Sequence, residues 1–270
     1  MSKYLAGVAV LMFVMVSAAV PANALDIPYT ATAPTAYGDA IWSSAASWTG
    51  IQTSKGTTWY EVNGTSIGSD ADCSATVSLL WDSTNLYAKV AVTDDVHADL
   101  RDVSSSSNND SIEFYLNAIN NPRGNDPPWS GLPPPVSQDL FGYKGGAIVK
   151  GASGINSQLS QFNGTISGGN YTLMGTWAWV GTGDGQLGLA AAPSVNDLIG
   201  FGLGVNESDD IAHDQWSFTG RDSEMMFWTS NNDLWTNPSS IPTFTLTPEP
   251  ATMALLVIGG VGMLIRRRRR

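Results

Sequence analysis

The sequence is poor in cysteine, in histidine and in charged residues. Its 270 residues include one cysteine and two histidines, and charged residues make up 14%. The single cysteine, Cys73, excludes an internal disulfide, and we expect it to be a small buried side chain because cysteine is among the most often buried residue types. With no histidine near it in the sequence, Cys73 is a poor candidate for a catalytic nucleophile.

Positive charge is also scarce outside the two ends of the chain. Residues 25–247 contain 7 Lys and Arg against 23 Asp and Glu, a net charge of −16. Such a field repels phosphate backbones, which excludes nucleic acid as the expected partner. Neutral sugars or cations suit this segment better.

The start of the chain, residues 1–24, has the three parts of a secretory signal peptide. A lysine precedes an apolar run over residues 5–20, and an Ala-x-Ala site follows that run. We predict export by the Sec route and cleavage by signal peptidase between Ala24 and Leu25. The alternative is an uncleaved membrane anchor, which the small residues after the apolar run disfavour.

The other end, residues 248–270, also has three parts: Pro248-Glu249-Pro250, an apolar run and five arginines. The run is shorter than the roughly 20 residues of a usual span, but arginine side chains can snorkel and the basic block stays in the cytoplasm. This end resembles a PEP-CTERM sorting signal. The resemblance implies an exosortase-type transpeptidase, cleavage near Pro248-Glu249-Pro250 and a transient inner-membrane anchor in a Gram-negative bacterium. A plain tail anchor is the alternative.

Strand patterns fill the region between these ends. Apolar and polar residues alternate at 86–92, 111–117, 171–179 and 199–205. No segment outside the two ends keeps a 3.6-residue period. We therefore predict an all-β fold, a single antiparallel, jelly-roll-like β-sandwich. It would span residues 37–247, follow an Ala/Thr/Pro-rich linker over 25–36, and be flanked by a signal helix and a short C-terminal transmembrane helix.

Five stretches of this region resemble, in order, family 9 carbohydrate-binding modules and the related DOMON-type sandwiches. They are YGDAIWSSAASW (37–48), ATVSLLWDSTNLYAKVAVTDD (75–95), NDSIEFYLN (109–117), IGFGLGVNESDD (199–210) and NNDLWTNPSSIPTFTL (231–246). The resemblance implies a β-sandwich that binds a polysaccharide or an oligosaccharide.

The resemblance also implies a sugar site. Trp235 matches one of the two tryptophans with which family members clamp a terminal sugar, Glu113 matches a sugar-contacting glutamate, and Asn232 matches a polar contact. Asn231 adds a second amide beside them. An indole covers the apolar C–H face of a sugar, while amides and carboxylates hydrogen-bond its hydroxyls. The alternative for Trp235 is a core tryptophan, as we expect for Trp177 and Trp179. Trp42 and Trp81 are expected in the core or as a cap on it.

The sequence departs from the family pattern at two positions of this site. Residues 107–109, where the second clamp aromatic would lie, read Ser-Asn-Asn, and Gly142 stands where some members have arginine. Trp129, in the following Pro-rich loop, is a candidate substitute for the missing aromatic.

Two acidic clusters are candidate metal ligands. Asp94 and Asp95 lie in the first, and Asp209 and Asp210 in the second. Calcium prefers oxygen ligands from loops, and relatives often bind it structurally, so we predict a structural calcium ion there, with solvated loop acids as the alternative. Haem held by histidine and methionine, as in DOMON-type relatives, is a weaker alternative.

We interpret the chain as an exported envelope or matrix protein that binds polysaccharide or oligosaccharide and is not an enzyme. One alternative is a structural matrix protein whose sandwich binds no ligand. Another is a module linked to glycoside hydrolysis, which ordinarily needs two carboxylates about 5–10 Å apart. No motif in the sequence selects such a pair.

Overall fold

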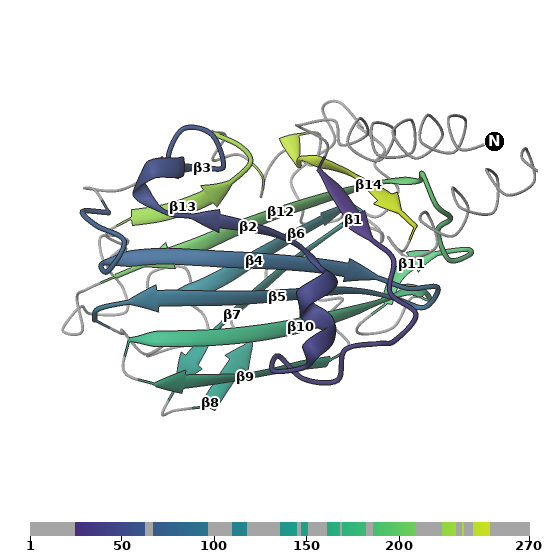
Figure 1. The fold of residues 1–270 in the computed structure, drawn as a ribbon, viewed down its shortest axis with the longest axis horizontal. Coiled ribbons are helices and arrows are strands. Elements are labelled where there is room, and N and C mark those ends of the chain that lie inside the picture. Colours follow the sequence, from purple (N-terminus) through teal and green to yellow (C-terminus); the bar gives the residue numbers. More distant parts are fainter. Residues whose placement is uncertain are drawn as a thin grey trace, which may run out of the picture.

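Alternating side chains account for most of the strands, because residues of one parity point into a shared core and those of the other parity point away. The computed structural model (Figure 1) describes residues 25–62, 67–96, 110–117, 136–144, 147–150, 161–167, 169–181, 186–208, 223–230, 234 and 240–248. Within these ranges the chain forms fourteen strands and two short 3-10 helices. The predicted all-β sandwich is confirmed.

The larger of the two sheets, sheet A, has eight strands. Its main order is β1 (Asp26–Pro28), β14 (Thr243–Thr247), β12 (Leu198–Glu207), β6 (Ser111–Asn117), β7 (Val136–Lys144) and β8 (Ala147–Lys150). The remaining two are β13 (Ser223–Phe227), which pairs with β12, and β3 (Trp59–Val62), which pairs with β13. The long strand β12 therefore has β6 on one side and both β14 and β13 on the other.

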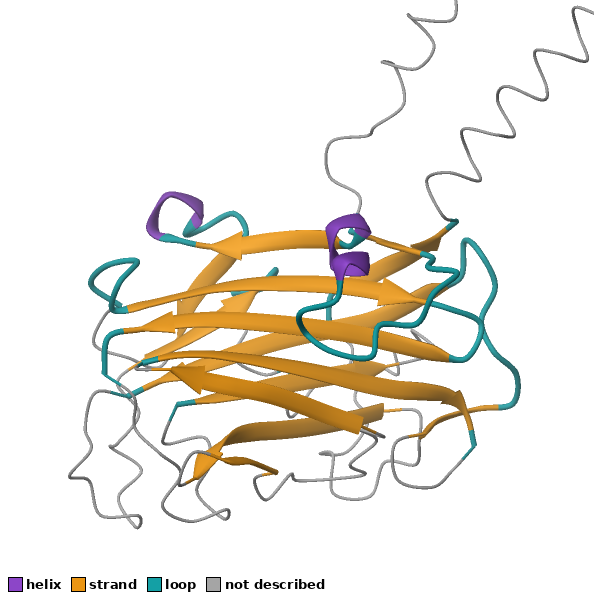
Figure 2. Ribbon diagram, turned by 60° about the horizontal axis from the view of Figure 1, so that its bottom comes forward, coloured by secondary structure: helices purple, strands orange, loops and turns teal. Residues whose placement is uncertain are grey.

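The smaller sheet, sheet B, has six strands. Its order is β11 (Gln186–Leu189), β10 (Asn170–Val180), β5 (Asn85–Asp94), β4 (Cys73–Trp81) and β2 (Ala46–Gly50), with β9 (Gln161–Ser167) also paired to β10. Figure 2 shows the two sheets as stacked layers with the short helices outside them. Most pairs are antiparallel, but β1 with β14 and β10 with β11 are parallel.

Aromatic rings fill much of the space between the sheets. Phe114 of sheet A meets Trp177 of sheet B edge to face, with ring centroids 5.0 Å apart. Trp81 and Trp179 are buried in the same core, as is Cys73 at 1% exposure. The predictions of core positions for these tryptophans and for Cys73 are confirmed.

The helix η1 (Ala40–Ser44) lies over the outer surface of sheet B (Figure 1). Its Trp42 packs against Leu80, Tyr87 and Met174 on that surface. Trp42 is thus buried, as predicted, but in a small cluster outside the sandwich core. Lys89 lies 5.1 Å from the centroid of its ring.

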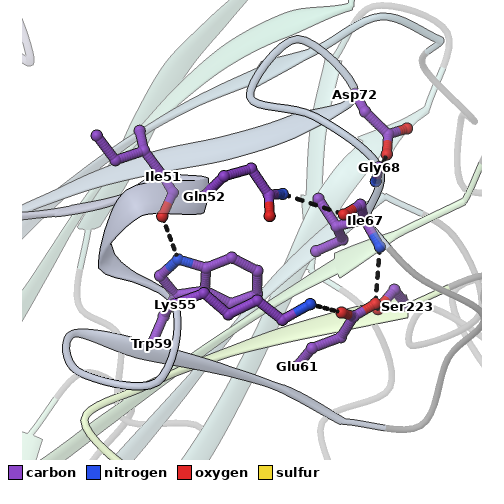
Figure 3. A network of polar contacts seen from close by, with 9 residues as sticks. All are labelled: Ile51, Gln52, Lys55, Trp59, Glu61, Ile67, Gly68, Asp72 and Ser223. Atoms are coloured by element: carbon purple, nitrogen blue, oxygen red, sulfur yellow. Dashed lines mark hydrogen bonds and ion pairs between the residues drawn. The ribbon is translucent and has the colours of Figure 1, made fainter.

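A polar network holds the turn that follows η2 (Gln52–Ser54) against sheet A (Figure 3). Lys55 forms an ion pair with Glu61 of β3. Glu61 also accepts hydrogen bonds from the Ser223 hydroxyl, at 2.8 Å, and from the Ile67 N–H, at 2.7 Å. Glu61 therefore links the residues just before and just after β3 to Ser223 of β13, which is distant in the sequence.

The linker predicted over residues 25–36 is wrong for its first part. Asp26–Pro28 form β1, which pairs in parallel with β14, and the side chain of Ile27 is fully buried in the core. The backbone continues the pairing, since the Tyr29 N–H donates to the Thr247 carbonyl at 2.8 Å. β1 is an edge strand, and an edge strand tolerates the missing N–H of Pro28. For this reason a strand can form in a proline-rich stretch whose composition indicates a linker.

Neither predicted flanking helix falls within the described residues. Residues 1–24 and 249–270 lie outside them, and with them Ala24, Glu249 and Pro250. Among the residues that the structure describes, no helix has the length and apolar character needed to cross a membrane.

Candidate functional site

The outer surface of sheet A, which faces away from sheet B, carries the first group of predicted site residues. In β6, Ile112 and Phe114 point into the core, so Glu113 and Tyr115 point outward. The strand register places Gly204 of β12 opposite Glu113 and Gly202 opposite Tyr115. Gly200, Gly202 and Gly204 thus form a strip without side chains along this face of β12, the glycine strip, and Asn206 is the next outward residue.

Glu113 is fixed by hydrogen bonds on this outer surface. The Tyr115 hydroxyl donates to one of its carboxylate oxygens, and Asn206 Nδ2 donates to the other at 2.9 Å. Asn206 Nδ2 also donates to the Ser111 hydroxyl at 2.9 Å. Glu113 is only 3% exposed. Its orientation is set by these neighbours.

A second buried carboxylate, Glu224 of β13, was missed by the sequence analysis. A Cβ built on Gly204 would lie 2.7 Å from Glu224 Oε1 and 3.7 Å from the Glu113 Cβ. The two glutamates therefore flank the same glycine. The register, which sets Glu224 opposite Asn206, puts both on one surface.

The closing segment, residues 229–241, reaches the same surface through Leu234. This side chain is fully buried in a cluster with Tyr115, Met226 and Ile241. Its chain neighbour Trp235, together with Asn231 and Asn232, lies outside the described residues. The structure thus places a residue adjacent to Trp235 against Tyr115, whose hydroxyl holds Glu113.

Carboxyl groups from both sheets gather at one end of the sandwich. Burial, followed by the negative charge of Asp110, raises the pKa of Asp94 well above its ordinary value, and Glu207 adds to this effect. Asp110 accepts a 2.8 Å hydrogen bond from the Ser208 N–H. All three acids are buried, whereas Asp95 is exposed. Asp94 of sheet B thus lies close to Glu207 of β12 and to Asp110, the residue before β6.

Comparison with known proteins decides the family. A family model described as "Carbohydrate family 9 binding domain-like" matches residues 35–248. The chain belongs to this family. A second model, the PEP-CTERM protein-sorting motif, matches residues 246–270 and indicates an exported protein sorted to the surface or envelope. The family 9 domain therefore ends where the sorting motif begins.

Solved structures of family 9 modules share the fold of this domain. A module from Caldicellulosiruptor kristjanssonii in complex with cellotriose is 17% identical, with a TM-score of 0.57, and the match covers 84% of this chain and 94% of that one. The module from the same organism in complex with glucose is 18% identical, with a TM-score of 0.58, and the match covers 84% and 96%. No curated protein matches the chain. At these identities the likeness supports the sandwich fold.

Two departures from the family pattern have different places in this family 9 domain. Gly142 of β7 pairs with Ser111, so the position where some members carry arginine lies on the outer surface of sheet A, beside the Glu113 network. Residues 107–109 and Trp129 fall outside the described residues.

Within the described ranges, no three or more His, Cys, Asp or Glu side chains are arranged to hold a metal ion. Asp209 and Asp210 of the predicted calcium set, and both histidines of the haem alternative, lie outside those ranges. The methionines of the haem alternative, Met225 and Met226, are both buried. Met225 lies in the core and Met226 in the cluster around Leu234.

Proposed function

We propose that this family 9 domain binds a polysaccharide or an oligosaccharide on the outer surface of sheet A. Glu113 would accept hydrogen bonds from sugar hydroxyls, and Trp235 would cover the apolar face of a sugar ring, with Asn231 and Asn232 beside it. Such a site needs a few fixed polar groups next to apolar walls, and the hydrogen-bonded Glu113 beside the cluster around Leu234 supports this location.

One observation carries this proposal. Leu234 packs on Tyr115, and Tyr115 holds Glu113. Leu234, the chain neighbour of Trp235, therefore lies on the same face of sheet A as Glu113, which supports a site formed jointly by β6 and the closing segment. Glu224 and Asn206 extend the polar part of this surface.

Calorimetry with cello-oligosaccharides, xylan and the host exopolysaccharide tests the proposal. We expect Trp235→Ala to weaken binding by about tenfold or more, since aromatic anchors dominate such sites. Glu113→Gln should weaken binding as well. Glu61→Gln removes a hydrogen-bonded carboxylate of the same sheet away from this surface, and should leave affinity unchanged. The absence of binding across the panel would overturn the proposal.

A structural matrix role is the second candidate, because Gly142 and residues 107–109 lack side chains that family members use. It requires that Trp235→Ala leave carbohydrate association unchanged. Hydrolysis by the sandwich itself would be revealed by release of reducing sugar that Glu113→Gln abolishes. We propose that the domain binds without cleaving, so no reducing sugar should appear.

We propose that two proteases process the ends of the chain. Signal peptidase would cut after Ala24, and an exosortase-type transpeptidase would cut near Pro248-Glu249-Pro250 while the apolar run holds the chain in the inner membrane of a Gram-negative cell. Mass spectrometry of the mature protein tests both cuts. A mature chain that still begins at Met1 or still ends in the arginines would contradict the corresponding step.

We propose a structural calcium ion at the acidic end of the sandwich. The predicted ligands Asp209 and Asp210 follow Glu207 closely in the chain, and the buried carboxyl groups of Asp94, Asp110 and Glu207 would add negative charge that favours a cation nearby. Asp95 stays a predicted ligand, although it is exposed. An ion present at 100 times its dissociation constant would add about 2.7 kcal/mol of stability. We expect a chelator to lower Tm by several degrees, and Asp110→Asn to remove that response. An unchanged Tm would refute the site.

A further inference from the structure

A methyl group at Gly202 would overlap a neighbouring side chain. A Cβ built there would lie 2.8 Å from Leu234 Cδ1 and 3.4 Å from the Tyr115 Cβ. Carbon atoms do not approach to 2.8 Å without one of them moving, so the space above Gly202 belongs to the Leu234 side chain. The Leu234 side chain therefore packs directly against the backbone of β12 at Gly202.

The closing segment touches the glycine strip at a second point near its end. A Cβ on Gly200 would lie 3.2 Å from Ile241 Cγ2 and 2.9 Å from the Asn117 Cβ. The next residue, Pro242, has its carbonyl 2.9 Å from the Phe201 N–H, which it accepts as a hydrogen bond. The segment is therefore tied to β12 where it leads into β14.

The beginning of the segment is fixed at Trp228. Its φ of 63° is in the left-handed region, which bulky residues rarely adopt and which turns the chain sharply after β13. Its ring packs back among core aromatics, with centroid distances of 5.0 Å to Phe244 and 5.3 Å to Trp48. The backbone N–H of Trp228 donates to the Thr58 carbonyl at 2.8 Å. The chain thus leaves the sheet from an anchored corner.

We propose that Gly202 and Leu234 form a seat that fixes the closing segment on sheet A and so sets how tightly its side chains hold sugar. This inference rests on the proposed function, because the segment carries Trp235, Asn231 and Asn232. Both seat residues are positioning residues and need not contact the ligand. A segment held in place before binding loses less conformational freedom when sugar arrives, which strengthens affinity.

A pair of substitutions with opposite changes in size tests the seat. Gly202→Ala would displace Leu234, and Leu234→Ala would empty the seat. Each should weaken binding of a cello-oligosaccharide by about tenfold or more, because overpacking and cavity formation both shift neighbouring groups. The double variant removes Leu234 Cδ1, the atom that the new methyl group of residue 202 would overlap. It should bind more tightly than either single variant.

Gly50→Ala is the matched control for these variants. A Cβ there would lie 2.6 Å from Met225 Sδ and 2.8 Å from Phe227 Cζ, inside the core. It therefore produces a comparable overlap away from the closing segment. It should lower Tm without changing the affinity of the folded protein, which separates a loss of stability from a loss of positioning.

Chymotryptic cleavage after Trp235 gives a second measurement that needs no ligand. We expect Gly202→Ala and Leu234→Ala to accelerate this cut by about fivefold or more at a temperature where both variants are folded, and Gly50→Ala to leave it unchanged. If both variants kept the wild-type affinity and the wild-type cleavage rate, the proposal that Gly202 and Leu234 position the closing segment would be wrong. If the wild-type protein binds no sugar, the proposed function and the affinity effect fall together, and the cleavage rates alone decide whether the seat holds the segment.

Discussion

The hydroxyl of Tyr87 donates a 2.7 Å hydrogen bond to Oδ2 of Asp82, in the turn between β4 and β5. The other oxygen of Asp82 accepts from the Thr84 N–H at 2.6 Å and from the Asn85 N–H at 2.7 Å. The indole of Trp179 donates to the Asp82 carbonyl at 2.8 Å. The turn at Asp82 is thus held by hydrogen bonds that join three strands of sheet B, β4, β5 and β10.

Asp82→Ala should lower the free energy of unfolding by about 2–3 kcal/mol, because it leaves one buried and several partly buried donors without an acceptor. Denaturant titration measures the change. Asp82→Asn, which keeps one acceptor oxygen, should cost less. A loss below about 0.5 kcal/mol for the alanine variant would show that the turn is held by its backbone alone.

The Glu61 network should make stability depend on pH at the acid end. Burial raises the pKa of Glu61, but hydrogen bonds from Lys55, Ser223 and the Ile67 N–H together bring it below its ordinary value of 4.5. A carboxyl with a lowered folded-state pKa stabilises the protein fully above its unfolded-state pKa, and this stabilisation is lost as pH falls through the folded-state pKa.

Glu61→Gln should therefore have a lower Tm than the wild type at pH 7, and the two Tm values should converge as pH falls below the ordinary pKa of 4.5. Thermal melts across this range test the prediction. A constant difference in Tm would mean that the carboxylate charge contributes nothing and that packing alone is altered.

The edge strand β1 should be essential to the sandwich. Ile27 is fully buried, so Ile27→Ala should reduce the free energy of unfolding by about 2–4 kcal/mol. Leu198, a neighbour of β14 in sheet A, is 48% exposed and provides a matched aliphatic control whose replacement by alanine should cost much less. Equal losses in the two variants would contradict the place of β1 in the core.

Cys73 should be inert in the folded protein. Burial raises the pKa of its thiol well above the ordinary value, and the acids Asp94, Glu207 and Asp110 raise it further. The reactive thiolate is therefore both scarce and inaccessible. Ellman's reagent at pH 8 should find no thiol in the native protein and one in denaturant. Rapid labelling of the native protein would show that this end of the sandwich opens.

The period-two alternation was enough to find the long strands, such as β5 and β12, and to assign Trp177 and Trp179 to the core. It could not find β1, because three residues show no period and the pairing partner lies at the other end of the domain. Glu224 was not predicted, because all five residues of β13 are buried and the outward and inward residues of this strand therefore show no alternation.

The candidate site was predicted in part, and from the resemblance more than from the residues themselves. The resemblance implies Glu113, and alternation puts it on the outward face of its strand, but its hydrogen bonds with Tyr115 and Asn206 depend on a strand pairing that sequence does not reveal. The gathering of Asp94 with Asp110 and Glu207 depends on how the two sheets stack. Trp235, Asn231 and Asn232 stay predictions.

The parallel pairing of β1 with β14 has a mechanical consequence. The Thr247 carbonyl accepts hydrogen bonds from the Trp81 indole, at 3.1 Å, and from the Tyr29 N–H. A protein tethered to the cell beyond Thr247 would receive every pull on that tether through β14. Because β14 lies between β1 and β12, tension along its axis loads hydrogen bonds on both sides in shear, so they must break together and not one after another.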